Sequence, residues 1–243
     1  MKFLSDVFII SKIYSRWILR NPLLYLMIAL ALPLGITISI GLFAPFDLRG
    51  HVLSGSIILS LITSGMIGLG QDFAADRLTN RISLFVTAPV SPLSYAIGVA
   101  AGNGLISLVG VAVLLAVGRV FLGVQIGYAF LFLTPVLLLS WLLSLSMGFL
   151  IGSYTKSAHV VGALTNLIMI FFVFFAPVYY PIEILPLPLR YVAYAVPTTY
   201  MAQAMRAAFA EDVRTAVFNM GILFVLTVMF ILISLKEVRW RER

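Results

Sequence analysis

The sequence predicts an all-α membrane protein with six transmembrane helices. Six long apolar blocks fill most of the 243 residues; 62% of the chain is hydrophobic and only 10% is charged. A helix needs about 20 mainly apolar residues to cross a bilayer core, whereas a soluble domain carries about 25% charged residues. The blocks are too continuous for the alternating strands of a barrel, so helices must satisfy the backbone in lipid. The predicted spans are residues 22–43, 52–70, 98–122, 128–151, 158–180 and 216–235.

The basic residues are distributed unevenly between the two sides of this predicted bundle. Eleven of the 16 Lys and Arg residues lie in the N-terminal segment, the second and fourth connections and the C-terminal segment, and five lie on the other side. By the positive-inside rule, both termini are expected in the cytoplasm of a multi-pass plasma-membrane protein. The net charge of +7 therefore indicates membrane orientation and not nucleic-acid binding. The absence of cysteine excludes disulfides and thiolate metal sites.

Residues 1–20 predict a helix lying in the membrane surface. Apolar and aromatic side chains recur at helical spacing, whereas basic side chains lie mostly off that stripe. A basic amphipathic helix of this kind lies at the interface and does not span the bilayer. The alternative is a leader that only sets orientation. The stripe consists of Phe3, Val7, Ile10, Tyr14 and Trp17.

The connection at residues 71–97 predicts a cytoplasmic coupling helix. Asp72 and Asp76 are expected at its N-terminus, where negative charge is favourable, and Pro89 and Pro92 end it. A connection with its own apolar face is suited to docking a soluble partner, although a simple structural loop is the alternative. The predicted docking residues are the apolar face Leu78, Ile82 and Phe85 with the flanking Arg77 and Arg81.

The segment at residues 176–213 predicts a re-entrant pair of short helices. Five prolines prevent one continuous helix, yet the segment stays apolar and aromatic for much longer than an ordinary loop. Irregular backbone at membrane depth requires shelter from protein or a cavity. Glu183 and Arg190 are expected at the outer water boundary and not as a buried pair. The predicted outer gate comprises Pro181, Glu183, Pro186, Arg190 and Pro197.

Within the spans, the remaining polar groups are small and share helical faces. They either pack helices together or line a substrate path, and the sequence does not separate these two roles. The Gly98–Gly102 and Gly148–Gly152 pairs favour close helix packing. The candidate path-lining residues are Ser56, Ser60, Thr63, Ser64, Thr165 and Asn166.

Three segments resemble the permease subunit of an ATP-binding-cassette (ABC) transporter of the type-2 exporter family. The N-terminal helix resembles the family's interface helix. Residues 76–91, with an acid-Arg pair followed by Leu-Phe-Val-Thr-Ala-Pro-Val-Ser, resemble its coupling segment, and residues 175–200 resemble the signature before its last helix. The sequence departs from the family pattern at residues 80–83 and at Val196. The resemblance implies six spans, pairing with a second permease subunit as a homodimer, and two cytoplasmic ATPase subunits on the coupling segments.

Sequence motifs for catalysis are lacking. No phosphate-binding Gly-x-x-x-x-Gly-Lys-Ser/Thr loop occurs, so ATP hydrolysis is expected on a partner and the chain is not expected to be an enzyme. No metal or cofactor is expected. The spans are nearly free of ionisable groups, which argues against ion-coupled transport. Hydroxyls and aliphatic side chains favour a lipid, a drug or another amphipathic substrate that is exported. The alternatives are an intramembrane hydrolase, which needs a nucleophile–base pair, and a non-catalytic membrane assembly factor.

Overall fold

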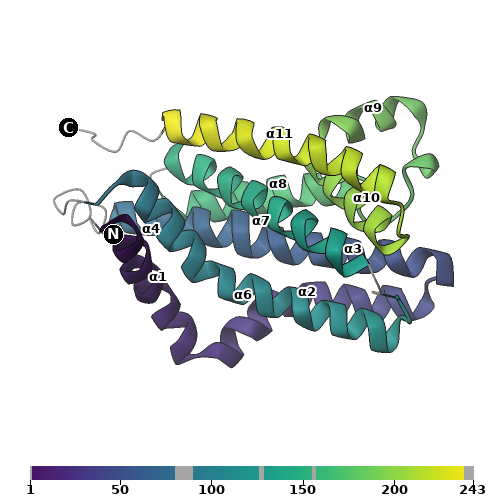
Figure 1. Ribbon diagram of the computed structural model, residues 1–243, viewed down its shortest axis with the longest axis horizontal. Helices are drawn as coiled ribbons and strands as arrows, with labels where there is room; N and C mark the ends of the chain where they lie inside the picture. Colours follow the sequence, from purple (N-terminus) through teal and green to yellow (C-terminus); the bar gives the residue numbers. More distant parts are fainter. Residues whose placement is uncertain (1, 80–89, 126–128, 155–156, 238–243) are drawn as a thin grey trace.

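The computed structural model describes residues 2–79, 90–125, 129–154 and 157–237, and every regular element within those ranges is helical. Most helices run side by side along the longest axis of the molecule (Figure 1). The start of α1 (Lys2–Arg20) and the end of α11 (Val213–Glu237) lie at the same end of this bundle. We call this the terminal end and the other the opposite end.

Each of the six apolar blocks forms a helix. In the described ranges, four stretches are long and apolar enough to cross a membrane: Phe46–Asp76, Ile97–Phe121, Leu131–Tyr154 and Val213–Ser234. Ala29–Phe43 and His159–Phe175 are shorter apolar helices, so the six-span topology stays a prediction. The helices over these blocks are α2 (Pro22–Phe43), α3 (Arg49–Ile62), α6 (Pro92–Phe121), α7 (Ala129–Tyr154), α8 (Ala158–Phe175) and α11.

The second block lies at the centre of the bundle. From α3 the helix continues through a π-helical turn, η2 (Thr63–Gly68), into α4 (Leu69–Leu78) without a break. A Cβ atom added at Gly148 of α7 would lie 2.4 Å from the carbonyl oxygen of Met66. One added at Gly152 would lie 2.9 Å from the carbonyl oxygen of Gly70. The close packing predicted for this glycine pair is therefore confirmed, because only glycine lets the two backbones approach so closely.

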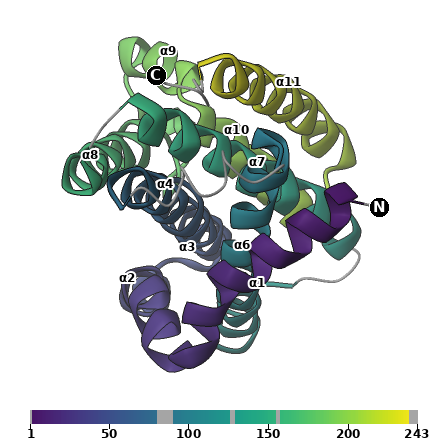
Figure 2. The ribbon, with the colours of Figure 1, turned by 90° about the vertical axis from the view of Figure 1, so that its left-hand side faces the viewer.

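Helix α1 crosses the terminal end at a steep angle to the bundle and packs against α6 (Figure 2). Added Cβ atoms at Gly98 and Gly102 of α6 would lie 2.6 and 2.7 Å from the Cβ atoms of Ile10 and Tyr14. The predicted apolar stripe of α1 thus meets α6 at its centre, where Ile10 is only 2% exposed. Other apolar side chains of α1, such as Phe8, are exposed. Its position in the membrane surface stays a prediction.

The proline-rich segment contains the two short helices that its sequence predicts. They are α9 (Leu187–Ala195) and α10 (Pro197–Phe209), preceded by a 3₁₀ turn, η3 (Ile182–Ile184). A proline lies in the first turn of each helix, where its missing N–H costs no hydrogen bond. Both lie toward the opposite end (Figure 1). Helix α10 packs against α3, α7 and α11, so it forms part of the core.

Candidate functional site

A buried cluster of tyrosines and aspartates joins three helices at the terminal end. Asp76 of α4 is 2% exposed. Its Oδ2 atom accepts hydrogen bonds from the hydroxyl of Tyr14 on α1 and from the hydroxyl of Tyr95 on α6, the latter at 2.7 Å. The two tyrosine hydroxyl oxygens are 3.3 Å apart. One carboxylate therefore connects α1, α4 and α6.

A second acid of α4 extends this network along α6. The Nδ2 atom of Asn103 donates to Oδ2 of Asp72 at 3.0 Å and to the carbonyl oxygen of Val99 at 3.3 Å. We call Tyr14, Asp72, Asp76, Tyr95 and Asn103 the tyrosine–aspartate cluster. Apolar side chains surround it, namely Ile10, Leu69, Phe73, Val99, Leu145 and Phe149.

The expectation that the two acids occupy a helix N-terminus is wrong. Because η2 carries the helix of α3 into α4, Asp72 and Asp76 lie near the end of a long helix. Negative charge at a helix C-terminus is unfavourable. Hydroxyl and amide donors from α1 and α6 stabilise the two carboxylates there, and the sequence pattern of α4 alone does not reveal those donors.

The predicted coupling residues begin directly after this cluster. Leu78 is in the last turn of α4 and is 57% exposed. Arg77 precedes it in the same helix, and Arg81, Ile82 and Phe85 lie outside the described residues. The cluster therefore fixes α4 within two residues of the predicted docking face.

The candidate path-lining hydroxyls face mostly into the protein. Ser56 and Ser60 are almost fully buried, and Ser64 accepts a hydrogen bond of 2.7 Å from Ser107 of α6. Within the described residues, the buried hydroxyls of Ser56 and Tyr179 both lack a hydrogen-bond partner. These positions match the helix-packing role that the sequence left open.

Backbone carbonyls accept the hydrogen bonds of the remaining candidates. Thr63 donates to Leu59 and Thr165 to Val161, at 2.8 and 2.7 Å. The amide of Asn166 donates to the carbonyl oxygen of Gly162, but its side chain is exposed on α8. Asn166 is therefore the exposed member of the predicted set, and a path-lining role for the set stays a prediction.

In the proline-rich segment, Arg190 folds back over η3. Its Nε atom donates to the carbonyl oxygen of Leu185 at 2.8 Å, and its Nη2 atom donates to the carbonyl oxygen of Glu183. Glu183 is exposed and Arg190 is half-buried. Pro181 is half-buried, Pro186 is exposed and Pro197 is buried at the start of α10. The structure thus brings Glu183 and Arg190 together through the backbone, and a gating role for them stays a prediction.

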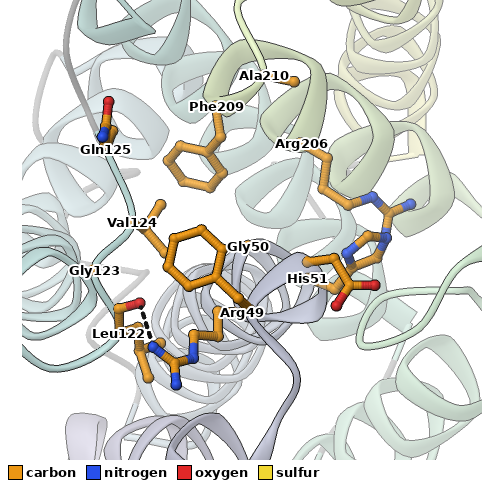
Figure 3. Close-up of a pocket in the computed structure, with 12 residues that line it drawn as sticks. Arg49, Gly50, His51, Leu122, Gly123, Val124, Gln125, Arg206, Phe209 and Ala210 are labelled. Carbon is orange, nitrogen blue, oxygen red and sulfur yellow. Dashed lines mark hydrogen bonds between the residues drawn. The ribbon is translucent and has the colours of Figure 1, made fainter.

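A cavity of about 370 Å³ opens at the opposite end of the bundle (Figure 3). Three connections that are distant in sequence form it: the turn before α3, the link between α6 and α7, and the end of α10. It is lined by Phe46, Asp47, Arg49, Gly50, His51, Leu122, Gly123, Val124, Gln125, Arg206, Phe209 and Ala210.

Backbone carbonyls hold two arginines at this cavity. Arg49 donates from Nη1 to the carbonyl oxygen of Leu122 at 3.2 Å, and its guanidinium lies 5.5 Å from the centre of the Phe46 ring. Arg206 donates from Nη1 to the carbonyl oxygen of Pro177 at 2.8 Å. Burial lowers the pKa of Arg206 to about 10, whereas the charge of Glu183 acts in the opposite direction. The guanidinium therefore keeps its proton at neutral pH.

No sequence pattern predicted this pocket beyond the five basic residues assigned to the outer side, among them Arg49 and Arg206. Neither arginine belongs to a recognisable motif. Both line one cavity because α10 packs beside α3, an arrangement that only the folded chain provides.

These features define a multi-pass helical membrane protein whose ionisable groups gather at its two ends. The model of the ABC-2 type transporter family matches residues 6–210. The chain therefore belongs to the ABC-2 type transporter family and is an ABC-2 type permease. Permeases of this family have no ATP site of their own and typically work with ATP-binding-cassette subunits. No curated protein matches this chain.

Proposed function

We propose that this permease is the transmembrane subunit of an ATP-driven exporter that moves a lipid, a drug or another amphipathic substrate out across the plasma membrane. The observation that carries this proposal is the tyrosine–aspartate cluster, of which Asp72, Asp76 and Tyr95 lie within the predicted coupling segment. It fixes the end of α4 to α1 and α6 through Asp76. Membership of the family over residues 6–210 supplies the ABC context.

The coupling segment at residues 71–97 is the proposed docking site for the ATPase subunits. Leu78, Ile82 and Phe85 enter an apolar groove on the ATPase, and Arg77 and Arg81 lie at the rim of that groove. When the ATPases close, they move the end of α4. The buried bonds of Asp76 pass this movement to α1 and α6, because a hydrogen-bonded carboxylate resists separation from its donors.

Orientation follows from the basic residues. The terminal end faces the cytoplasm and the opposite end faces outward, as the eleven-to-five distribution of Lys and Arg predicts. The segment at residues 176–213 then caps the outer end of the pathway. The exposed Glu183 and the half-buried Arg190 support this placement, because charge is far less costly at the water boundary than in the bilayer core.

The exposed face of α8 is the proposed contact with a second copy of the chain. It presents large apolar side chains, among them Leu167, Phe171 and Phe174, beside the exposed amide of Asn166. A polar group on the lipid-facing side of a helix is costly, and such groups usually meet another helix or a water-filled path. A homodimer provides both, since each copy would supply half of the pathway.

The substitution Ile82→Asp tests the coupling role directly. A charge in the apolar docking contact should abolish substrate-stimulated ATPase activity in the reconstituted complex while leaving membrane insertion intact. Thr79→Asp is the matched control, because residue 79 is exposed and lies off the predicted docking face. Unchanged stimulation in the Ile82→Asp complex would refute the docking site.

Cysteine labelling tests the outer segment, since the natural chain has no cysteine. A membrane-impermeant thiol reagent added from outside should react with Glu183→Cys and leave Val178→Cys unmodified, because residue 178 is fully buried. Labelling of Glu183→Cys from the cytoplasmic side alone would reverse the proposed orientation. Strong labelling of both variants would indicate an ordinary solvated loop.

A further inference from the structure

Within the described residues, no carboxylate forms an ion pair with the two arginines at the opposite-end cavity, although the charge of Glu183 acts on Arg206. Within the ranges that the structure describes, Arg49 and Arg206 donate to carbonyl oxygens of Ala44, Leu122, Pro177 and Tyr180 and form no ion pair. Asp47 lines the same cavity but is exposed and pairs with neither guanidinium. Neither cation is therefore neutralised by an ion pair with a described residue at the cavity wall.

Such an arrangement is costly for an empty site. A partly buried cation loses hydration, and carbonyl dipoles return only part of that free energy. A guanidinium presents five N–H donors in a planar fork suited to carboxylate and phosphate oxygens. Arg206 uses Nη1 for its carbonyl contacts, and Arg49 uses Nε and Nη1. Donors on both side chains thus remain for an anion.

The cavity also has an apolar side. Phe209 lines it beside Val124 (Figure 3), and Phe46, which is 73% exposed, belongs to the same lining. A volume of about 370 Å³ is near the lower limit of small-molecule pockets, which span about 300–1,000 Å³. It accommodates a headgroup and the first part of an apolar body, but not a whole lipid.

We propose that this cavity binds the anionic group of an amphiphile, a phosphate or a carboxylate, at the wall that Arg49 and Arg206 line. Phe46 and Phe209 contact the apolar part next to that group. The placement of the site on the outer face rests on the proposed function, whereas the binding itself does not. An outer-leaflet lipid and a free phosphate compound offer the same chemistry, and the experiment separates them.

The experiment uses the full chain in phosphatidylcholine nanodiscs with and without phosphatidylglycerol, and native mass spectrometry to count retained phosphatidylglycerol. The double variant Arg49→Gln/Arg206→Gln should retain it at least about tenfold more weakly than the natural chain, because charge-assisted bonds are lost. Arg119→Gln/Arg214→Gln is the matched control, since it removes the same charge from exposed residues outside the cavity. The control should retain the lipid as the natural chain does.

A titration with glycerol phosphate and with inorganic phosphate identifies the source of the anion. Saturable binding of either compound that the cavity variant loses supports a free-anion ligand, and binding of phosphatidylglycerol alone supports a lipid headgroup. Equal lipid and phosphate binding by the cavity variant and the control overturns the proposal. The variant Arg49→Lys/Arg206→Lys controls for misfolding of the Gln variant. It keeps the two positive charges and should restore part of the binding.

Measuring lipid binding and ATPase stimulation in both variants distinguishes a failure of this proposal from a failure of the proposed function. Ile82→Asp lies far along the chain from the cavity residues and should bind phosphatidylglycerol normally. Normal ATPase stimulation in that variant, together with loss of lipid from the arginine variant, refutes the coupling role and leaves the anion site standing. Loss of ATPase stimulation in Ile82→Asp, together with normal lipid retention by the arginine variant, refutes the anion site alone.

Discussion

The charged side chains at the two ends of the bundle have opposite surroundings. At the terminal end, the carboxylate of Asp76 is 2% exposed and accepts hydroxyl hydrogen bonds from two other helices. At the opposite end, Arg49 and Arg206 donate to backbone carbonyls at the wall of a cavity of about 370 Å³. The acid is enclosed by the protein, whereas the two partly buried arginines line a cavity.

This difference indicates that the charge of Asp76 serves helix packing, whereas the charges of the two arginines serve ligand binding. Side chains of α1 and α6 surround Asp76 and tie their helices to α4, so the charge there serves the packing of the helices. The arginines connect short segments of chain and leave donor groups toward the cavity. Removal of charge should therefore harm folding at the terminal end and ligand binding at the opposite end.

The largest expected effect is that of Asp76→Ala. The hydroxyls of Tyr14 and Tyr95 would both lose their common acceptor inside the protein. Hydrogen bonds to charged groups contribute about 1.5–3 kcal/mol each, so the free energy of unfolding should fall by at least about 3 kcal/mol. Thermal unfolding in detergent measures it. Asp6→Ala, on the less buried part of α1, should change the Tm little; equal losses in both variants would contradict a structural role for the cluster.

Gly98→Ala should separate the same helices by steric means. Its added Cβ would lie 2.6 Å from Cβ of Ile10, so α1 must shift away from α6. Overpacking of this kind costs about 1–3 kcal/mol. Gly221→Ala in α11 is the matched control, because no atom lies within 4 Å of an added Cβ there. That control should be neutral or slightly stabilising, and a comparable loss of Tm at residue 221 would invalidate the steric explanation.

Tyr14→Phe removes one of the two hydroxyl bonds to Asp76 and keeps the ring. The expected loss is about 1.5 kcal/mol, at the lower limit for a bond to a charged group, because Tyr95 still donates. ATPase coupling should weaken along with stability, since α1 is less firmly tied to α4. Tyr191→Phe, on a ring that is 76% exposed, serves as the control in both assays. Full coupling and an unchanged Tm in Tyr14→Phe would show that Tyr95 alone maintains the connection.

The smallest change in stability is expected for Arg206→Met. The variant loses a hydrogen bond to Pro177 but also removes a partly buried cation that forms no ion pair within the described residues. These contributions oppose one another, so the free energy of unfolding should change by less than about 1 kcal/mol. The Tm in lipid-free detergent measures it. A loss as large as that of Asp76→Ala would remove the distinction between the two ends.

Local sequence features predicted the helices well and their partners poorly. Apolar length located the six helices, and the prolines of residues 176–213 indicated the division into the short helices α9 and α10. Pro92, which was expected to end a helix, instead begins α6. The glycine pairs predicted close packing without indicating that Gly98 meets α1 or that Gly148 meets η2. The acids of α4 were misplaced because local charge pattern indicated a helix N-terminus, whereas the helix of the preceding span continues through them.

The sequence by itself determined that this chain is a helical membrane protein and a member of its family, because apolar length and short motifs are local properties. Only the tertiary structure decided how the charges are used. Tyr14 and Asp76 are 62 residues apart, and Arg206 is 29 residues from the carbonyl that it contacts. Such bonds depend on which helix faces cross and at what height. Many side chains acting together set that geometry. The tyrosine–aspartate cluster and the cavity lined by the two arginines therefore form only in the folded chain.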